Sequence, residues 1–339
     1  MSINLIRAPK HRTNLLYVAA LGTVACAIGT LSTHASGAVI FQDTFGGGST
    51  VNSASPAAPT ATSASYQILS SKAWAPTPSV AAGDLKFGIN STSSGHIEAQ
   101  AVFSNTPVAL TNAGDYIELT MTFTDTAGIL TANGILGFGM YSSGGVGPMA
   151  GGMNGTATSS TTISGGAQGW QGYDARVLFN NGTNTNKIAT RPNESAITTA
   201  INQDLVTEGS GSQSYPGGTS LGSALSGVTL VAGNTYTEDL IFTLSAAGTY
   251  QITSALYDGV GTGGTQLYTQ TVSATGGNFY NVGFDALAVG WRETGSQATT
   301  MDISSITVST NVAVPEPTMA GAAALVVTAA AARRRRRSR

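Results

Sequence analysis

Two short segments combine large aromatic residues with side chains that form hydrogen bonds. The first contains Trp170, Tyr173 and Asp174, and the second contains Trp291 and Arg292. A sugar ring offers an apolar C–H face and a rim of hydroxyls, so flat aromatic side chains flanked by short polar ones can bind it. The same aromatic residues are also common in β-sandwich cores. We therefore treat these residues as candidates for saccharide binding, with burial in the core as the competing role.

The carboxylates show no spacing that is typical of a glycosidase. A retaining glycosidase needs its two carboxyl groups about 5 to 5.5 Å apart on one face. Asp115 and Glu118 are three residues apart, and Glu238 and Asp239 are adjacent, so each pair would point to opposite sides of a strand. We expect these side chains to be solvated. The sequence favours a protein without enzymatic activity, and a polysaccharide hydrolase or lyase on the same scaffold is the alternative.

No metal or nucleophile motif is evident. Outside the N-terminal leader, His96 is the one histidine and there is no cysteine, whereas a zinc site needs three or four such ligands. We therefore expect no cofactor. The only hint of a metal is a loop whose amide oxygens would suit calcium, but no carboxylate lies between Asp174 and Glu194. That loop contains Asn180, Asn181, Asn184 and Asn186.

The body of the chain reads as a series of β-strands. Apolar and polar residues alternate in 116–124, which is typical of a half-buried antiparallel strand. Segments 236–244 and 250–256 flank a short turn and predict a hairpin. In the last strand, the alternation changes phase between Ile303 and Ile306, which predicts a β-bulge. Further strands are expected near 39–45, 66–69, 85–89, 97–103, 135–141, 173–179, 267–272 and 282–291.

About twelve strands without a convincing helix indicate an all-β, antiparallel two-sheet sandwich. Segments 284–292 and 301–308 together resemble the closing strands of a concanavalin A-like or laminin G-like jelly roll. That resemblance implies two curved sheets, and the concave face holds saccharides in many relatives. Two insertions, 142–169 and 209–227, are rich in glycine, serine and threonine, and we expect them to be mobile.

Residues 1–37 read as a secretory signal peptide. Basic residues Arg7, Lys10 and Arg12 precede an apolar stretch at 15–31, and small residues follow it. The only cysteine, Cys26, lies within this stretch, so the exported body at 38–313 cannot form disulfides. We treat the body as one domain that is held together by its own core.

The last segment, 314–339, has three parts in order. A short proline-containing motif comes first, an apolar run at 319–332 follows, and a block of arginines ends the chain. The motif is Val314, Pro315, Glu316 and Pro317, and the block is Arg333, Arg334, Arg335, Arg336 and Arg337. The order resembles the PEP-CTERM sorting signal of Gram-negative, biofilm-forming bacteria. In that family exosortase, a membrane-embedded cysteine transpeptidase, recognises the tail and removes it as the protein moves to the cell surface.

The physical properties of this tail suit a temporary anchor. Its apolar run is 14 residues long, and at about 1.5 Å per residue it spans roughly 21 Å of a hydrocarbon core about 30 Å thick. The arginines would snorkel to the interface and keep the end of this short transmembrane helix on the cytoplasmic side. We therefore expect the protein to pass through the inner membrane before it reaches the surface or the extracellular matrix.

Charge narrows the choice of partners. The body has six basic and sixteen acidic residues, a net charge of −10, because nine of the fifteen basic residues lie in the two terminal segments. Such a body is a poor ligand for nucleic acid or anionic lipid. It suits a neutral, hydroxyl-rich partner such as an exopolysaccharide. We expect a structural or adhesive role with saccharide binding, and threonine-rich outward strand faces also fit packing against copies of the chain.

The sorting motif gives the first testable prediction. Replacing Pro315 and Pro317 by Ala removes the two fixed φ angles that keep the motif extended for an enzyme. We expect the variant to stay in the membrane fraction at its unprocessed mass, as measured by fractionation and mass spectrometry. Normal processing of the variant would rule out recognition of this motif.

Overall fold

The computed structural model describes most of the body of the chain. The described residues are 37–46, 67–70, 79–81, 83–89, 95–126, 134–145, 147, 169–179, 186–193, 205–206, 219–225, 227–293 and 299–313. Apart from Gly37, both predicted terminal signals lie outside these ranges, so they stay predictions. Within the described ranges, no helix is long and apolar enough to cross a membrane.

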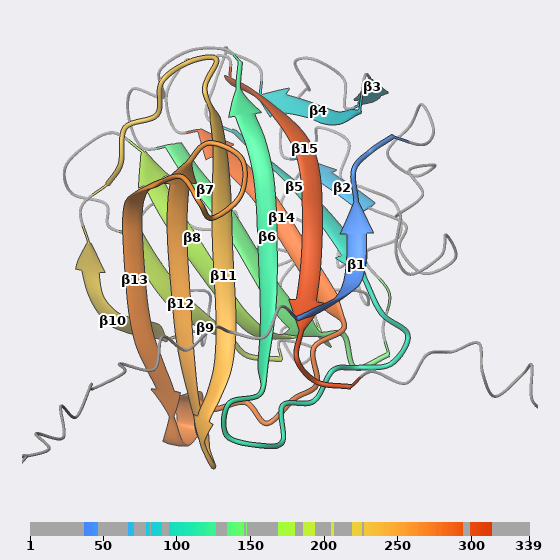
Figure 1. Ribbon diagram of the computed structural model, residues 1–339, viewed down its shortest axis with the longest axis vertical. Helices are drawn as coiled ribbons and strands as arrows, with labels where there is room; N and C mark the ends of the chain where they lie inside the picture. Colours follow the sequence, from blue (N-terminus) through green and yellow to red (C-terminus); the bar gives the residue numbers. More distant parts are fainter. Residues whose placement is uncertain are drawn as a thin grey trace, which may run out of the picture. The chain divides into compact units, whose positions relative to one another are not determined.

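Two antiparallel sheets pack face to face in the body (Figure 1). Sheet A has the order β13-β12-β11-β6-β15-β4-β3. Strand β4 pairs with the first half of β15, and β1 pairs with its second half on the same side. Its strands are β1 (Ala38–Asp43), β3 (Ser79–Ala81), β4 (Asp84–Ile89), β6 (Tyr116–Asp125), β11 (Thr235–Ala246), β12 (Thr249–Asp258), β13 (Thr265–Thr275) and β15 (Thr299–Thr310).

Sheet B forms the second layer and has the order β10-β9-β8-β7-β14-β5-β2. Its two central neighbours, β7 and β14, lie far apart in the sequence. Its strands are β2 (Gln67–Ser70), β5 (Gly95–Val102), β7 (Gly134–Ser142), β8 (Gln171–Phe179), β9 (Asn186–Arg191), β10 (Ser220–Leu225) and β14 (Ala286–Glu293). The predicted all-β two-sheet antiparallel sandwich is therefore confirmed.

The core lies between the two inner faces, as the alternation predicted. Ile117, Leu119 and Phe123 are fully buried on β6, and their partners on β11 and β15 point the same way. The predicted β-bulge in the last strand is also confirmed, because the register of β15 against β6 shifts between Ile303 and Ser305. The shift keeps both Ile303 and Ile306 fully buried.

Other details differ from the prediction. Strands β3, β9 and β10 were not expected, and β10 lies inside the insertion at 209–227 that was predicted to be mobile. A single inward side chain, Leu221, packs into the core and fixes β10 beside β9. One buried leucine among small and polar residues is too weak a signal for a strand prediction.

The prediction that Glu238 is solvated is wrong. Glu238 alternates with Tyr236 and Leu240 on the inner face of β11 and is fully buried, where Ser254 Oγ donates to its Oε1 over 3.2 Å. Burial raises the pKa of Glu238 well above its ordinary value, and the bond from Ser254 opposes this only in part.

Candidate functional site

The outer face of sheet B has an unusual floor of small residues at its centre. Directly opposed residues in a sheet share a face, and the register pairs Gly137 with Gly290 and Gly139 with Ala288. We call these four residues the floor. Val289 and Phe138, one position along, point into the core. Two adjacent central strands therefore present almost no side chain to the outside over two successive rows.

One rim of the floor carries a carboxylate and an amide. Glu98 and Gln100 lie on β5, opposite Gly290 and Ala288 respectively, and both are fully buried. Gln100 Nε2 donates to Glu98 Oε1 over 2.8 Å. The amide thus fixes the orientation of the carboxylate, which faces across the floor.

The opposite rim carries an ion pair. Asp174 and Arg176 lie on β8, opposite Gly139 and Gly137 respectively. Arg176 Nε donates to Asp174 Oδ2 over 2.9 Å, and the two residues are 6% and 0% exposed. A guanidinium that binds a neighbouring carboxylate in this way keeps its other N–H groups in a fixed plane.

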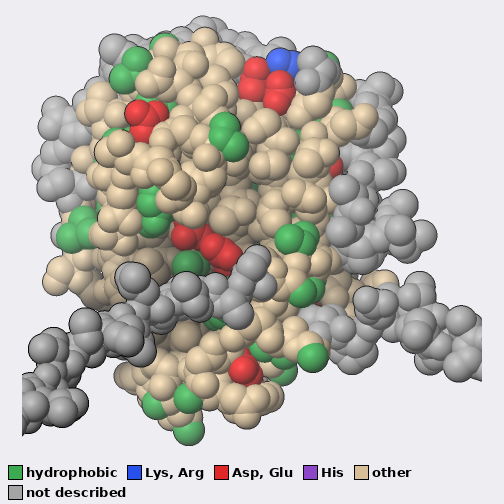
Figure 2. All heavy atoms as spheres, in the orientation of Figure 1, with side chains coloured by type: hydrophobic (Ala, Val, Ile, Leu, Met, Phe, Trp, Pro, Cys, Tyr) green, Lys and Arg blue, Asp and Glu red, His purple; other side chains and the backbone are tan. Residues whose placement is uncertain are grey.

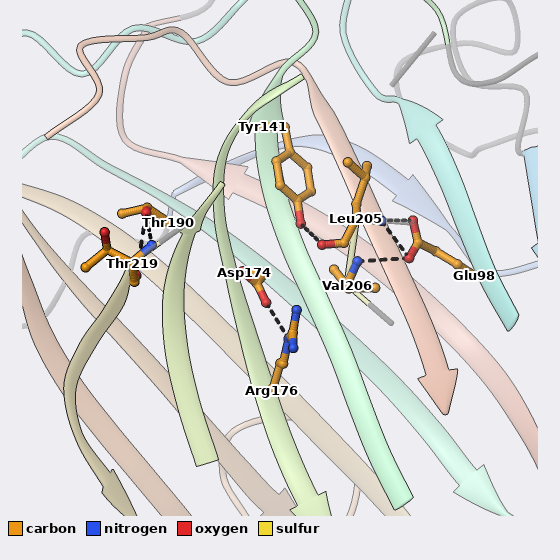
Figure 3. A network of polar contacts seen from close by, with 8 residues as sticks. All are labelled: Glu98, Tyr141, Asp174, Arg176, Thr190, Leu205, Val206 and Thr219. Carbon is orange, nitrogen blue, oxygen red and sulfur yellow. Dashed lines mark hydrogen bonds and ion pairs between the residues drawn. The ribbon is translucent and has the colours of Figure 1, made fainter. Parts of the chain in front are cut away.

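A short piece of the chain lies on the floor (Figure 3). We call Leu205–Val206 the covering segment. The Glu98 carboxylate accepts Leu205 N–H at 2.8 Å and Val206 N–H at 2.9 Å, and Tyr141 Oη donates to Leu205 O over 3.4 Å. A Cβ atom at Gly137 would lie 2.5 Å from the Val206 carbonyl oxygen, so this position requires glycine. The backbone of the covering segment therefore sits directly against the floor.

The covering segment also closes a small second core. Leu205 and Val206 pack with Tyr141, Trp170 and the outward alanines of β14, and all are fully buried. The rings of Tyr141 and Trp170 lie 6.2 Å apart. Sheet B is therefore covered on both faces, by the sandwich core on one side and by this cluster on the other.

The residues predicted from the sequence fall in three places. Asp174 and Trp170 belong to the outer face of sheet B and its cover. Tyr173 and Trp291 point inward instead and are 0% and 3% exposed, so neither ring is a surface platform in this structure. Arg292 occupies β14 opposite His96. The structure does not bring these five residues together into one site.

Tyr173 has a clear structural role. Its hydroxyl donates to Asn278 O over 2.9 Å and accepts Tyr280 N–H over 2.8 Å, and its ring lies 5.6 Å from Phe242. Burial raises the pKa of this hydroxyl, so it stays a neutral donor. Tyr173 thus ties the loop before β14 to the core.

Several residues of the site were missed in the sequence. Glu98, Gln100, Arg176 and the floor glycines were not singled out, although alternation in 95–102, 134–142, 171–179 and 286–293 places those of each strand on one face. The sequence also contains a Gly-x-Ser-x-Gly spacing at 218–222, which could indicate a serine nucleophile and was not recognised. The structure places its serine, Ser220, within strand β10 rather than at the strand-to-helix turn of a hydrolase.

A second polar group lies on the outer face of sheet A, where Figure 2 shows acidic side chains over β11. Asp239 alternates with buried Glu238 and so points outward, but it is only 4% exposed, which contradicts the expectation that it is solvated. Burial and the neighbouring Glu118 carboxyl raise the pKa of Asp239 to about 8. Ser309 Oγ donates to Glu118 Oε2 over 2.7 Å. With its pKa raised to about 8, Asp239 keeps its proton at neutral pH.

Metal binding has little support among the described residues. No group of three or more histidine, cysteine, aspartate or glutamate side chains is close enough there to hold an ion. In the asparagine-rich loop that was considered for calcium, residues 180–185 lie outside the described part of the chain, and Asn186 begins β9.

No protein-family model and no curated protein matches the chain. Among solved structures, the chain is similar to the carbohydrate recognition domain of Emp47p, with 9% identity over 83% of this chain and 100% of that one, at a TM-score of 0.38. It is also similar to the exoplasmic/lumenal domain of VIP36 in a Ca2+/Man3GlcNAc-bound form, with 11% identity, 74% and 86% coverage, and a TM-score of 0.38. A third similar structure is lectin II from Ulex europaeus, with 11% identity, 73% and 93% coverage, and a TM-score of 0.34.

The covering segment gives a prediction. In Glu98→Gln one of the two acceptor oxygens becomes an amide, so the N–H groups of Leu205 and Val206 lose charge-assisted bonds worth about 1 to 3 kcal/mol. We expect the amide hydrogens of both residues to exchange about tenfold faster or more. Hydrogen exchange measures this, with Glu118→Gln on the other sheet as the control. Equal exchange in both folded variants would contradict the assignment.

The raised pKa of Asp239 gives a second prediction. An unfolded Asp239 loses its proton near pH 3.8, whereas the folded one keeps it up to about pH 8. The unfolded state therefore binds fewer protons between about pH 4 and 8, and the free energy of unfolding falls as the pH rises through that window.

Asp239→Asn removes this term, so it should gain stability relative to wild type as the pH rises toward 8, and the gain should then level off. Urea unfolding from pH 4 to 9 measures it. Asp115→Asn is the control with no pH term in this range, because the bonds from Thr111 and Asn112 lower the pKa of Asp115 below its ordinary 3.8, so its charge is the same in both states above about pH 4. A wild-type minus Asp239→Asn difference that does not change with pH would refute the raised pKa of Asp239.

Proposed function

We propose that this protein is an exported, non-enzymatic binding protein that uses the outer face of sheet B to hold a neutral saccharide. The floor and its two polar rims carry this proposal. A sugar ring is flat and about as wide as the spacing of two strands, so it can lie on glycine and alanine. Two linked sugar units lying across the floor would then meet Glu98 and Gln100 at one rim and the Asp174–Arg176 pair at the other.

The contacts of the covering segment support this reading. It presents two neighbouring N–H donors to the Glu98 carboxylate and one acceptor to the Tyr141 hydroxyl. Two neighbouring sugar hydroxyls can make the same pattern, because a hydroxyl both donates and accepts. A saccharide on the floor would replace the covering segment, and part of its binding energy would be used to displace that segment.

A hydrolase or lyase is the less favoured function. The two acidic side chains that face the floor, Glu98 and Asp174, lie on β5 and β8, with β14 and β7 between them. Each carboxylate is already bound within the fold, because Glu98 accepts the N–H groups of Leu205 and Val206 and Asp174 accepts Arg176 Nε. Glu118 and Asp239 are neighbours, but they lie on the other sheet.

Delivery to the surface forms part of the same proposal. The N-terminal leader would export the chain, and exosortase would recognise the Val314–Pro317 motif while the C-terminal helix is still in the inner membrane. The processed body would remain at the surface or in the extracellular matrix of a Gram-negative bacterium. Its net charge of −10 favours a neutral exopolysaccharide as the partner over an anionic one.

A pair of variants with opposite effects tests the binding site. Arg176→Gln removes the guanidinium of one rim, and we expect it to weaken binding to neutral glycans at least tenfold. Leu205→Ala removes a buried side chain from the covering segment, so the floor is uncovered more easily and affinity should rise several-fold. Binding is measured on a glycan panel with matched neutral and uronate polymers.

Lys86→Gln is the control for charge, because Lys86 pairs with Asp302 on sheet A. It should leave glycan binding unchanged. Absence of binding to every saccharide, or a lower affinity in Leu205→Ala, would overturn the site on sheet B.

A further inference from the structure

Two acidic side chains meet on the outer face of sheet A. Glu118 lies on β6 directly opposite Ile241, and Asp239 lies on β11 directly opposite Thr120, so the two acids are diagonal neighbours on adjacent strands. Their carboxyl groups are close enough to form a hydrogen bond with each other. Two carboxylates in contact repel each other unless a positive charge lies between them.

This pair has few hydrogen-bond donors. Ser309 Oγ donates to Glu118 Oε2 over 2.7 Å. Asp239 is only 4% exposed, and its Oδ1 is buried without an N–H or alcohol donor. A buried carboxylate oxygen with no donor is costly. Asp239 therefore presents an unsatisfied oxygen to the site that it forms with Glu118.

Other carboxylates of the described body are matched by donors of their own. Asp115 accepts the N–H groups of Thr111 and Asn112, and Asp174 accepts Arg176 Nε. The strands of sheet A contain a single basic residue, Lys86, which is bound to Asp302 near the start of β15. Glu118 pairs with Ser309 near the other end of that strand. The positive charge that the pair needs must therefore come from solution.

The surrounding side chains supply further oxygen atoms. Ser309 lies directly opposite Glu118, and Thr120 lies directly opposite both Asp239 and Thr307. All three hydroxyl residues are half-buried. Opposed residues have Cβ atoms about 4.5 to 5.5 Å apart, so oxygens from three adjacent strands can reach one point between them. The group has two acidic members rather than three, and hydroxyls complete it.

This set of ligands selects among metal ions. Carboxylate and hydroxyl oxygens suit hard cations, whereas zinc prefers histidine and cysteine. Magnesium needs near-octahedral geometry and usually keeps several waters, for which the burial of Asp239 leaves little room. Calcium accepts six to eight oxygens in irregular arrangements, including bidentate carboxylates. The site therefore fits calcium best.

We propose that Glu118 and Asp239 bind a calcium ion on the outer face of sheet A, with the hydroxyls of Ser309 and Thr120 and water as the remaining ligands. The ion joins β6, β11 and β15 across their outer face and neutralises the two adjacent carboxylates. This site is independent of the saccharide proposal, because it lies on the other sheet. With only two carboxylates, we expect a dissociation constant of about 0.1 to 1 mM.

Calorimetric titration of calcium into the chain recovered from an exporting host tests the site. A chelator first removes bound metal, and the titration is run at about pH 8.5, where Asp239 is mostly ionised. Asp239→Asn and Glu118→Gln each remove one charge and keep the shape of the side chain, so each should raise the dissociation constant tenfold or more. Asp115→Asn is the matched control, because it removes an acidic charge of the same sheet outside the site and should bind calcium like wild type.

Urea unfolding with and without calcium gives a second measurement. An ion that binds only the folded state stabilises it by mass action, so calcium should stabilise wild type and Asp115→Asn but neither site variant. Absence of calcium binding in wild type at about 10 mM, or equal affinity for magnesium, would overturn the proposal. Unchanged affinity in Asp239→Asn, or an equal loss in Asp115→Asn, would do so as well, since either result means general attraction to an acidic body.

Discussion

The bond from the Glu98 carboxylate to two consecutive backbone N–H groups determines how the outer face of sheet B is closed. A buried carboxylate is costly unless donors surround it, and here Leu205, Val206 and Gln100 supply three of them. Without these donors, Glu98 would need water, and the face would have to open. By holding the covering segment in place, Glu98 thus also keeps the second core around Trp170 buried.

This closure explains the composition of the central strands. A sheet that is covered on both faces cannot use simple alternation of apolar and polar residues. Strands β7 and β14 place large residues inward, such as Phe138 and Leu287, and glycine or alanine outward, where backbone must approach backbone. Gly137 illustrates the constraint, because any Cβ there would collide with Val206. On sheet A, by contrast, the outward hydroxyl pair of Thr253 and Thr271 is exposed.

The sequence predicted the fold well where burial alternates with period two. The hairpin of β11 and β12, the bulge in β15 and most strand positions follow from side-chain pattern alone. Strands β9 and β10 could not be predicted, because each has one large apolar side chain in the core, Ile188 and Leu221, and the other buried side chains of β9 are Ala189, Thr190 and Arg191. Alternation also says which residues share a face, but not which faces are covered.

For this reason the sequence predicted only part of the candidate site. Asp174 was found because it is polar and lies near Trp170, whereas Arg176 and Glu98 look like ordinary outward residues of two distant strands. Only the strand order, which inserts β14 between β5 and β7, brings them to opposite rims of one floor. Likewise, Glu238 and Asp239 look like a solvated pair, and it is tertiary packing on both faces of β11 that buries each of them.

The cover on sheet B also limits what the proposed site could bind. Displacing the covering segment would use part of the binding energy of a saccharide, so a single site on sheet B would be weak. A repeating polymer would overcome this weakness where several copies of the chain lie at the same surface, because neighbouring weak sites then act at high effective concentration. The same cover that protects the floor from water would therefore favour a polymer over a free monosaccharide.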